Sequence, residues 1–150
     1  MTPNFHLEII EKQQSYQAEK YASTVCQQVI SATIEMYTTS GFHKPWVGYL
    51  VVDSDVIVGA AGYTGVPENN EVEISYFTFQ EYEGKGYAAF ACGELIKIAK
   101  SHRPEVVIFA KTAPEENAST RILSKNGFVY QKVVQDHEIG DAWLWQLAHR

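Results

Sequence analysis

The sequence has few cysteines and no long apolar run. Its two cysteines, Cys26 and Cys92, are too few for a disulfide framework or a cysteine metal cluster, so we expect buried free thiols and a cytoplasmic protein. No apolar run approaches the roughly 18 residues that cross a bilayer, which argues against a membrane-spanning protein. The first residues lack the basic start and apolar core of a signal peptide, and none is expected.

Basic residues are in the minority as well. The 12 Lys and Arg residues stand against 18 Asp and Glu, whereas general nucleic-acid binders are basic, so no nucleic-acid partner is expected. The five histidines show no paired metal-ligand spacing, and no metal is expected. Because no repeat, low-complexity tract or linker interrupts the 150 residues, the sequence predicts one domain, residues 1–150. A monomer and a homodimer are both compatible with the sequence.

Strand and helix patterns follow one another in a way typical of an α/β (α+β) protein. The predicted strands are 5–10, 46–52, 56–64, a run that starts at Glu71, 105–111, 128–135 and 142–147. The predicted helices are about 14–38, a segment between Gly84 and Pro104, and 114–125, which Asn126-Gly127 ends. A helix separates the strand from Glu71 and the strand at 105–111, so these two are expected to be parallel in a mixed sheet.

The strand that starts at Glu71 changes phase along its length. Its apolar residues are first even-numbered (Val72, Ile74, Tyr76) and then odd-numbered (Phe77, Phe79). This pattern fits either a β-bulge near 76–78 or a strand end that is buried on both faces.

The turn after this strand is the most informative feature of the chain. Gly84-Lys85-Gly86 leads directly into a helix at Tyr87 and Ala88. The first turn of a helix carries unpaired N–H groups and a partial positive charge, and glycines let a phosphate approach them closely. The segment 84–88 is therefore a candidate site for a phosphate-bearing cofactor.

Two common phosphate-binding motifs fit this turn poorly. The Walker sequence Gly-x-x-x-x-Gly-Lys-Ser/Thr is absent. Gly84, Gly86 and Ala89 match the dinucleotide pattern Gly-x-Gly-x-x-Gly/Ala, but the acidic ribose ligand expected about 20 residues later is missing. A different phosphate-bearing ligand is therefore favoured.

The segment Glu83-Gly-Lys-Gly-Tyr-Ala88 resembles the pyrophosphate loop of the GNAT superfamily of acyl-CoA-dependent N-acetyltransferases, whose pattern is Gln/Arg-x-x-Gly-x-Gly/Ala. Gly86 and Ala88 match the last two positions, and Glu83 replaces the first. A second block at 114–128 is similar to the Asn-x-Ser … Gly-Phe segment of the branch that acetylates ribosomal-protein N-termini (RimJ/RimL-like) and small amines. Asn117 and Ser119 carry that second match.

This resemblance implies a GNAT fold, with a mixed, mostly antiparallel central sheet of about six to seven strands and flanking helices. The strand before the loop would splay from its neighbour and expose Phe77, Thr78 and Phe79 to the pantetheine arm. The resemblance further implies acetyl-CoA as cosubstrate, bound through 84–88. Acetyl would pass directly, in a ternary complex, to a primary amine, which is a protein N-terminus or a small cationic amine.

The resemblance also suggests roles for three polar residues. Glu73 is the candidate base, and its alternative is an exposed strand carboxylate that pairs with a lysine or arginine. Ser119 is the candidate proton donor to the thiolate, and its alternative is a serine that bonds its own helix start. Asn117 would contact the pantetheine amides, cap the helix, or do both.

Two positions depart from the resemblance. Leu123 stands where many relatives carry a tyrosine, and Glu83 stands where they carry Gln or Arg. These departures keep an alternative open, namely a non-catalytic CoA-binding or regulatory module of the same fold.

Overall fold

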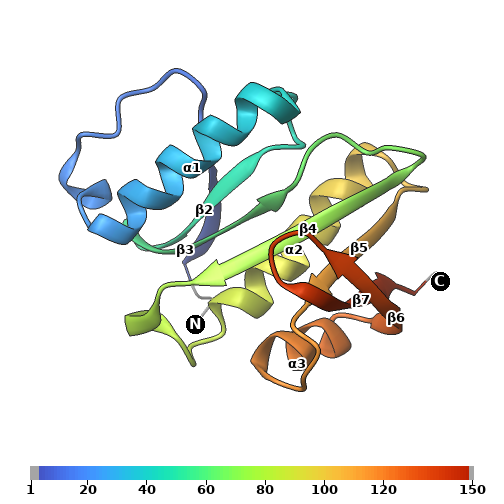
Figure 1. The fold of residues 1–150 in the computed structure, drawn as a ribbon. Coiled ribbons are helices and arrows are strands. Elements are labelled where there is room, and N and C mark those ends of the chain that lie inside the picture. Colours follow the sequence, from blue (N-terminus) through green and yellow to red (C-terminus); the bar gives the residue numbers. More distant parts are fainter. Residues whose placement is uncertain (1–3, 149–150) are drawn as a thin grey trace.

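The computed structural model describes residues 4–148 and contains a seven-stranded sheet with helices on both faces (Figure 1). The strands are β1 (Phe5–Ile9), β2 (Gly48–Asp53), β3 (Val56–Tyr63), β4 (Glu71–Thr78), β5 (Val107–Thr112), β6 (Phe128–Asp136) and β7 (Gly140–Leu147). The helices are α1 (Thr24–Ser40), α2 (Tyr87–His102) and α3 (Ala118–Lys125), with short 3-10 turns η1 (Glu19–Tyr21) and η2 (Gln80–Tyr82).

The strand order is β1-β2-β3-β4-β5-β7-β6. Only β4 and β5 pair in parallel among the described strands, and the other neighbours are antiparallel. The predicted mixed, mostly antiparallel sheet and its parallel pair are therefore confirmed. The last strand, β7, lies between β5 and β6, so β6 forms the edge (Figure 1).

The first helix begins ten residues later than the sequence pattern predicted. Ser23 is the N-cap of α1, and its hydroxyl accepts a hydrogen bond from the N–H of Cys26 at 3.2 Å. Such a cap favours a helix start at that position. The preceding segment instead places Tyr16 and Tyr21 in the core, where their rings pack edge to face.

The strands β4 and β5 part after a short stretch of pairing. Their register runs only from Glu71↔Val107 to Glu73↔Phe109, after which β5 pairs with β7 on its other side. The pairing of β4 with β3 continues to Thr78. The gap that begins beyond Glu73 and Phe109 is called the β4/β5 opening below, and it matches the predicted splay.

The phase change in β4 comes from burial on both faces. The β3–β4 register is continuous, so the bulge interpretation is wrong. Val72 and Ile74 belong to the core cluster under α2, whereas Phe79 is buried in the cluster under α1. Phe77 remains 53% exposed. The strand end therefore carries apolar side chains on opposite sides of the sheet.

The sheet separates two packed layers. Odd-numbered residues of β2, such as Tyr49 and Val51, belong to the cluster with Leu95 of α2, and even-numbered ones, such as Leu50, belong to the cluster with Ile30 of α1. Alternation of side chains along a strand produces this division. Among the described residues, no helix has the length and apolar character needed to span a membrane.

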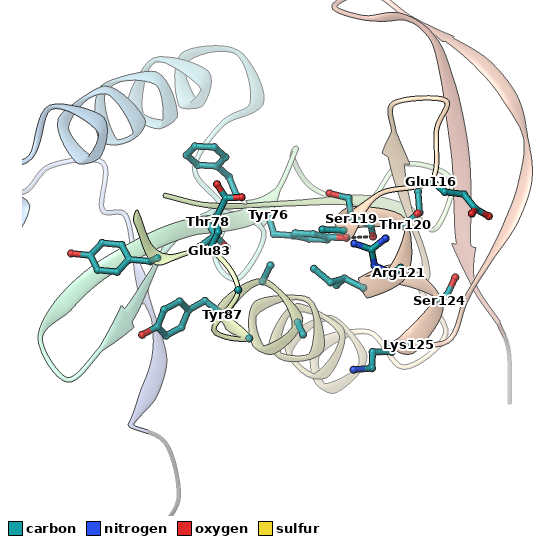
Figure 2. A pocket seen from close by; sticks show the side chains of 18 of the residues that line it. Tyr76, Thr78, Glu83, Tyr87, Glu116, Ser119, Thr120, Arg121, Ser124 and Lys125 are labelled. Carbon is teal, nitrogen blue, oxygen red and sulfur yellow. Dashed lines mark hydrogen bonds between the residues drawn. The ribbon is translucent and has the colours of Figure 1, made fainter. Parts of the chain in front are cut away.

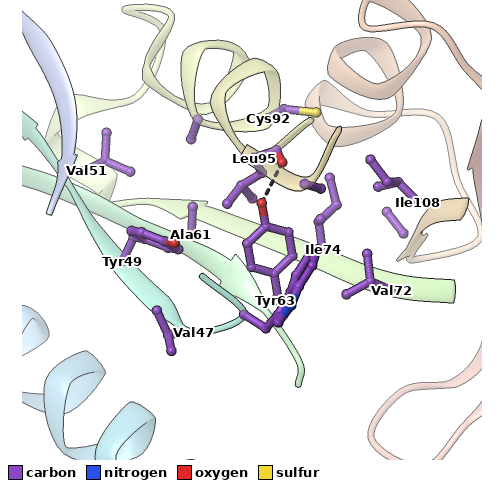
Figure 3. Packing of buried hydrophobic residues seen from close by; sticks show 14 of the residues in the cluster. Val47, Tyr49, Val51, Ala61, Tyr63, Val72, Ile74, Cys92, Leu95 and Ile108 are labelled. Atoms are coloured by element: carbon purple, nitrogen blue, oxygen red, sulfur yellow. Dashed lines mark hydrogen bonds between the residues drawn. The ribbon is translucent and has the colours of Figure 1, made fainter. Parts of the chain in front are cut away.

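Tyr63 crosses the larger core cluster and fixes α2 to the sheet (Figure 3). Its hydroxyl donates a 2.5 Å hydrogen bond to the carbonyl of Leu95, and burial raises the pKa of this tyrosine, so the hydroxyl stays protonated. The contact satisfies the one polar group that this side chain carries into the core.

Replacing Tyr63 by phenylalanine is expected to lower the free energy of unfolding by about 1 kcal/mol, because the ring packing stays and one buried hydrogen bond is lost. Denaturant unfolding followed by fluorescence measures the change. Tyr130→Phe is the matched control, since that ring is 44% exposed. An equal loss in both variants would contradict this role for the Tyr63 hydroxyl.

Candidate functional site

A cavity of about 1010 Å³ opens on the face of the sheet that carries α2 and α3 (Figure 2). Its walls come from the end of β4, the glycine turn, the first turn of α2 and one side of α3. Apart from tyrosine and tryptophan, the polar side chains that line it are Thr78, Glu83, Glu116, Ser119, Thr120, Arg121, Ser124 and Lys125. A cavity of this size accommodates a cofactor-sized ligand.

The glycine turn enters α2 through two left-handed residues. Gly84 has φ +81° and Gly86 has φ +87°, a region that disfavours any residue with a Cβ. A Cβ at either position would meet no atom within 4 Å, so the turn borders open space. Backbone conformation, rather than crowding, is what requires glycine here.

The start of α2 lacks the side-chain cap that the other two α-helices have. Asn117 and Thr120 form a capping box on α3, and Ser23 caps α1, whereas Gly86 has no side chain to cap α2. The first N–H of this region to bond within the helix is that of Phe90, which donates to Gly86. The three N–H groups at 87–89 therefore remain free of partners in the described chain and border the cavity, as an anion-binding helix start requires.

The side chain of Tyr87 anchors this helix start to the sheet. Its hydroxyl donates to a carboxylate oxygen of Asp53 at 2.6 Å, and its ring lies 4.8 Å from that of Phe5. Asp53 ends β2, so the contact ties α2 to the hairpin formed by β2 and β3. The N–H groups of the turn are thereby held in one place.

Tyr76 spans the space between β4 and α3 (Figure 2). Its hydroxyl donates to the carbonyl of Ser119 at 3.1 Å, and burial raises its pKa, so it stays a protonated donor. Tyr76 was not among the predicted site residues. Its even number, shared with the core residues Val72 and Ile74, was a signal that it faces the helices.

Ser119 lines the same cavity from the first turn of α3. Asn117 and Thr120 already cap that turn, and the Ser119 hydroxyl makes no hydrogen bond with the described residues. The alternative of a serine that caps its own helix is therefore not what the structure contains. The hydroxyl is free to bind a ligand.

The backbone at the end of β4 presents polar groups to the opening. The Glu73 carbonyl and the Phe79 N–H both bond to the β3 side of the sheet. Because backbone direction alternates along a strand, the N–H and C=O groups of Tyr76 and Thr78 point the other way, toward the β4/β5 opening. They have no strand partner there, since pairing with β5 ends at Glu73.

The structure brings most of the predicted coenzyme-binding residues together. Those that line the cavity are Phe77, Thr78, Gly84, Gly86, Tyr87 and Ala88. Three others do not line it. Lys85 is exposed on the turn, Phe79 is buried in the core beneath α1, and the Asn117 side chain accepts the N–H of Thr120.

Two cations of α3, Arg121 and Lys125, line the cavity and were not singled out from the sequence (Figure 2). Their spacing of four residues places them on one side of the helix, which was the available signal. Leu123, which stands where many relatives carry a tyrosine, is fully buried in the core and brings no polar group to the cavity.

Glu73 lies on the opposite face of the sheet from the cavity. It faces Lys111 of β5 at 3.9 Å, and Lys111 also faces Asp136 at 3.4 Å. Burial raises the pKa of Glu73, and the charge of Lys111 opposes that rise. The predicted alternative, pairing with a lysine, is therefore present, although the carboxylate is only 23% exposed.

Neither cysteine is placed for nucleophilic chemistry. Burial raises the pKa of Cys92 to about 12 and also raises that of Cys26, so both thiols stay protonated. Within residues 4–148, no group of three or more His, Cys, Asp or Glu side chains could hold a metal ion.

The chain is similar to known acetyltransferases in sequence and in fold. A curated relative, the uncharacterized N-acetyltransferase p20 of Bacillus licheniformis, is 29% identical over 107 residues, which are 67% of this chain and 60% of that protein. The match thus spans less than two thirds of the relative's length.

Three solved structures share the fold. The ribosomal L7/L12 alpha-N-protein acetyltransferase RimL in complex with coenzyme A has a TM-score of 0.69 at 13% identity, covering 97% of this chain and 94% of that one. The ribosomal-protein-S5-alanine acetyltransferase of Vibrio fischeri has a TM-score of 0.69 at 16% sequence identity, and the match covers 97% of this chain and 93% of that one. A spermidine N-acetyltransferase SpeG chimera from Vibrio cholerae and hSSAT has a TM-score of 0.69 at 14% sequence identity, and the match covers 96% of this chain and 95% of that one.

The family match covers most of the chain. Residues 5–129 match the acetyltransferase (GNAT) domain, from β1 to the start of β6. This span contains the glycine turn, the β4/β5 opening and α3. The chain therefore belongs to the GNAT acetyltransferase family.

Proposed function

We propose that this protein is an N-acetyltransferase that moves acetyl from acetyl-CoA directly to a primary amine in a ternary complex. The observation that carries the proposal is the uncapped start of α2, whose free N–H groups border a cavity next to the β4/β5 opening. Membership of the GNAT family supports it.

The residues of the cavity fit acetyl-CoA. The N–H groups at 87–89 would hold its pyrophosphate, and the cations Arg121 and Lys125 lie on the facing wall. The backbone groups of Tyr76 and Thr78 would meet the pantetheine amides and the thioester oxygen, where an N–H stabilises developing negative charge. When bound, acetyl-CoA supplies the activated acetyl group.

Glu73 is the proposed base. An amine must lose a proton to act as a nucleophile, and amines with a pKa near 8 to 10.4 are largely protonated at neutral pH. Glu73 stands at the start of the β4/β5 opening on the face away from the coenzyme cavity. An acceptor that approaches from that face would meet the carboxylate before the thioester, directly or through a water molecule.

Ser119 is the proposed proton donor to the departing thiolate. Its hydroxyl lines the cavity, and Tyr76 holds the carbonyl of the same residue. Both cysteines are buried and protonated, which favours direct transfer over an acetyl-cysteine intermediate.

A primary amine of a protein N-terminus or a small cationic molecule is the proposed acceptor. Structural neighbours of both kinds support this proposal, since one is named an alpha-N-protein acetyltransferase of ribosomal L7/L12 and another a spermidine N-acetyltransferase. The face with Glu73 also carries Asp136 and Glu138, whose charges favour a cation over an anion.

Calorimetry with coenzyme A, followed by an acetylation assay, tests the proposal. Coenzyme A at 100 times its dissociation constant should raise the unfolding free energy by about 2.7 kcal/mol. A panel of polyamines and N-terminal peptides with acetyl-CoA should then release thiol and yield a product heavier by one acetyl group. Binding without turnover would favour the non-catalytic CoA-binding module, and no binding would overturn both.

Replacing Ser119 by alanine is expected to lower kcat by about tenfold or more with little change in coenzyme A affinity, because a proton donor acts in the transition state. Steady-state kinetics and calorimetry measure the two effects. Ser124→Ala is the matched control, since it removes another hydroxyl that lines the cavity from α3. Equal rates for both variants would remove Ser119 from the mechanism.

A further inference from the structure

Three charged side chains meet on the face of the sheet opposite the coenzyme cavity. Lys111 Nζ lies 3.4 Å from Asp136 Oδ1 and 3.9 Å from Glu73 Oε1. All three side chains are partly buried, with exposures of 28% for Lys111, 16% for Asp136 and 23% for Glu73. We call these residues the Lys111 cluster.

Asp136 is held rigidly at the end of β6. Its second oxygen accepts the N–H groups of Glu138 and Ile139 at 3.0 and 3.3 Å. The Glu138 N–H lowers the pKa of Asp136, and so do the Ile139 N–H and Lys111, so the carboxylate stays charged. The turn between β6 and β7 therefore fixes Asp136, and Asp136 in turn fixes the ammonium group of Lys111.

The register places this cluster at the start of the β4/β5 opening. Glu73 and Phe109 are the last residues that β4 and β5 pair. Lys111 follows Phe109 by two residues, so it lies on the same face of β5 and just beyond the paired segment. Glu73 and Lys111 thus stand on either side of the point where the strands part.

We propose that Lys111, fixed by Asp136, is a positioning residue that keeps the Glu73 carboxylate charged and held at the opening. The inference rests on the proposed function, in which Glu73 is the base. A base must be unprotonated to accept the proton of the acceptor amine. Partial burial disfavours the charged carboxylate, and a cation within about 4–6 Å offsets that cost.

Among the charges around Glu73, Lys111 contributes most to keeping the carboxylate unprotonated. From the end of β6 and the turn that follows, Asp136 and Glu138 raise the pKa of Glu73, and His137 lowers it when protonated. Burial also raises this pKa, as the largest contribution. Lys111 is the main opposing charge, so its removal leaves burial and two carboxylates acting in the same direction.

Carbon-13 carboxyl NMR on protein labelled at glutamate tests the inference, with the Glu73 signal assigned by its absence in Glu73→Gln. In Lys111→Met the titration midpoint of Glu73 should rise by roughly one pH unit. Lys111→Gln should reproduce the rise, and Lys111→Arg should restore the original midpoint. Lys132→Met, which removes an exposed lysine of β6 outside the cluster, should leave it unchanged.

The pH dependence of kcat/KM gives a second readout. The acidic limb that belongs to Glu73 should move to higher pH in Lys111→Met, whereas the limb of the acceptor amine stays in place because it belongs to the free substrate. A midpoint that does not move in the NMR titration overturns the inference, whatever the activity. Full activity of Glu73→Gln would instead remove the base from the proposed function, while the NMR result would still decide the effect of Lys111.

Discussion

Replacing Gly86 by alanine is expected to weaken coenzyme A binding by about tenfold or more. An L-residue with a Cβ costs about 1–2 kcal/mol in the left-handed region, so the turn would relax away from φ +87° and tilt the N–H groups at 87–89. The added methyl would also project into the open space beside those groups. A loss of 1.4 kcal/mol corresponds to a tenfold change in affinity. Calorimetry with coenzyme A measures it directly.

Gly140→Ala is the matched control for this substitution. Gly140 has φ +79°, and a Cβ there also meets no atom within 4 Å, but it lies at the start of β7 and does not line the cavity. Both variants should lose similar stability to the same backbone strain. Only Gly86→Ala should lose affinity. Unchanged binding in Gly86→Ala would show that the glycine turn does not hold the pyrophosphate.

Replacing Glu73 by glutamine is expected to lower kcat/KM at neutral pH by about 10²–10⁴, with coenzyme A affinity unchanged. The amide keeps the size of the side chain and removes its ability to accept a proton. Burial raises the pKa of Glu73, so in the wild type its contribution to activity is lost as the pH falls through that raised value. The variant should lack this acidic limb and regain activity as the pH approaches the pKa of the acceptor amine.

Glu71→Gln controls for the change of charge on β4. Glu71 lies two residues away on the same face of the strand, is exposed, and has no place in the Lys111 cluster. Its substitution should leave kcat/KM within about twofold, as is usual for a surface change. A loss in Glu71→Gln as large as that in Glu73→Gln would point to a general effect of charge rather than to a base.

The elements of the fold were largely predictable because their patterns are local. The helix after Gly84, the helix ended by Asn126-Gly127 and the parallel pairing of β4 with β5 all follow from periodicity, caps and connection length. The start of α1 was not predictable from periodicity, since Tyr16 and Tyr21 are buried in the core although they precede the helix. They pack in the core from the segment before the helix, Tyr16 from a loop and Tyr21 from η1, and the cap at Ser23 decides where the helix begins.

The site was predictable in part. The residues of the glycine turn were identified because the two left-handed glycines and the helix start that follows are adjacent in the sequence. Tyr76 was missed, because its hydroxyl meets Ser119 only when α3 packs beside β4. Phe79 was expected near the coenzyme, but the α1 side of the sheet buries it. Contacts of this kind join residues that are distant in sequence.

The sequence alone determined the family resemblance, the α/β class and the position of the glycine turn, since each depends on residue types at short, fixed spacing. Only the tertiary structure decided which groups share a face of the sheet. It placed Ser119 and Tyr76 at the cavity, and it placed Glu73 with Lys111 and Asp136 on the other side. The reason is the strand order, because inserting β7 between β5 and β6 sets the position of the Asp136 turn, and no local pattern specifies that order.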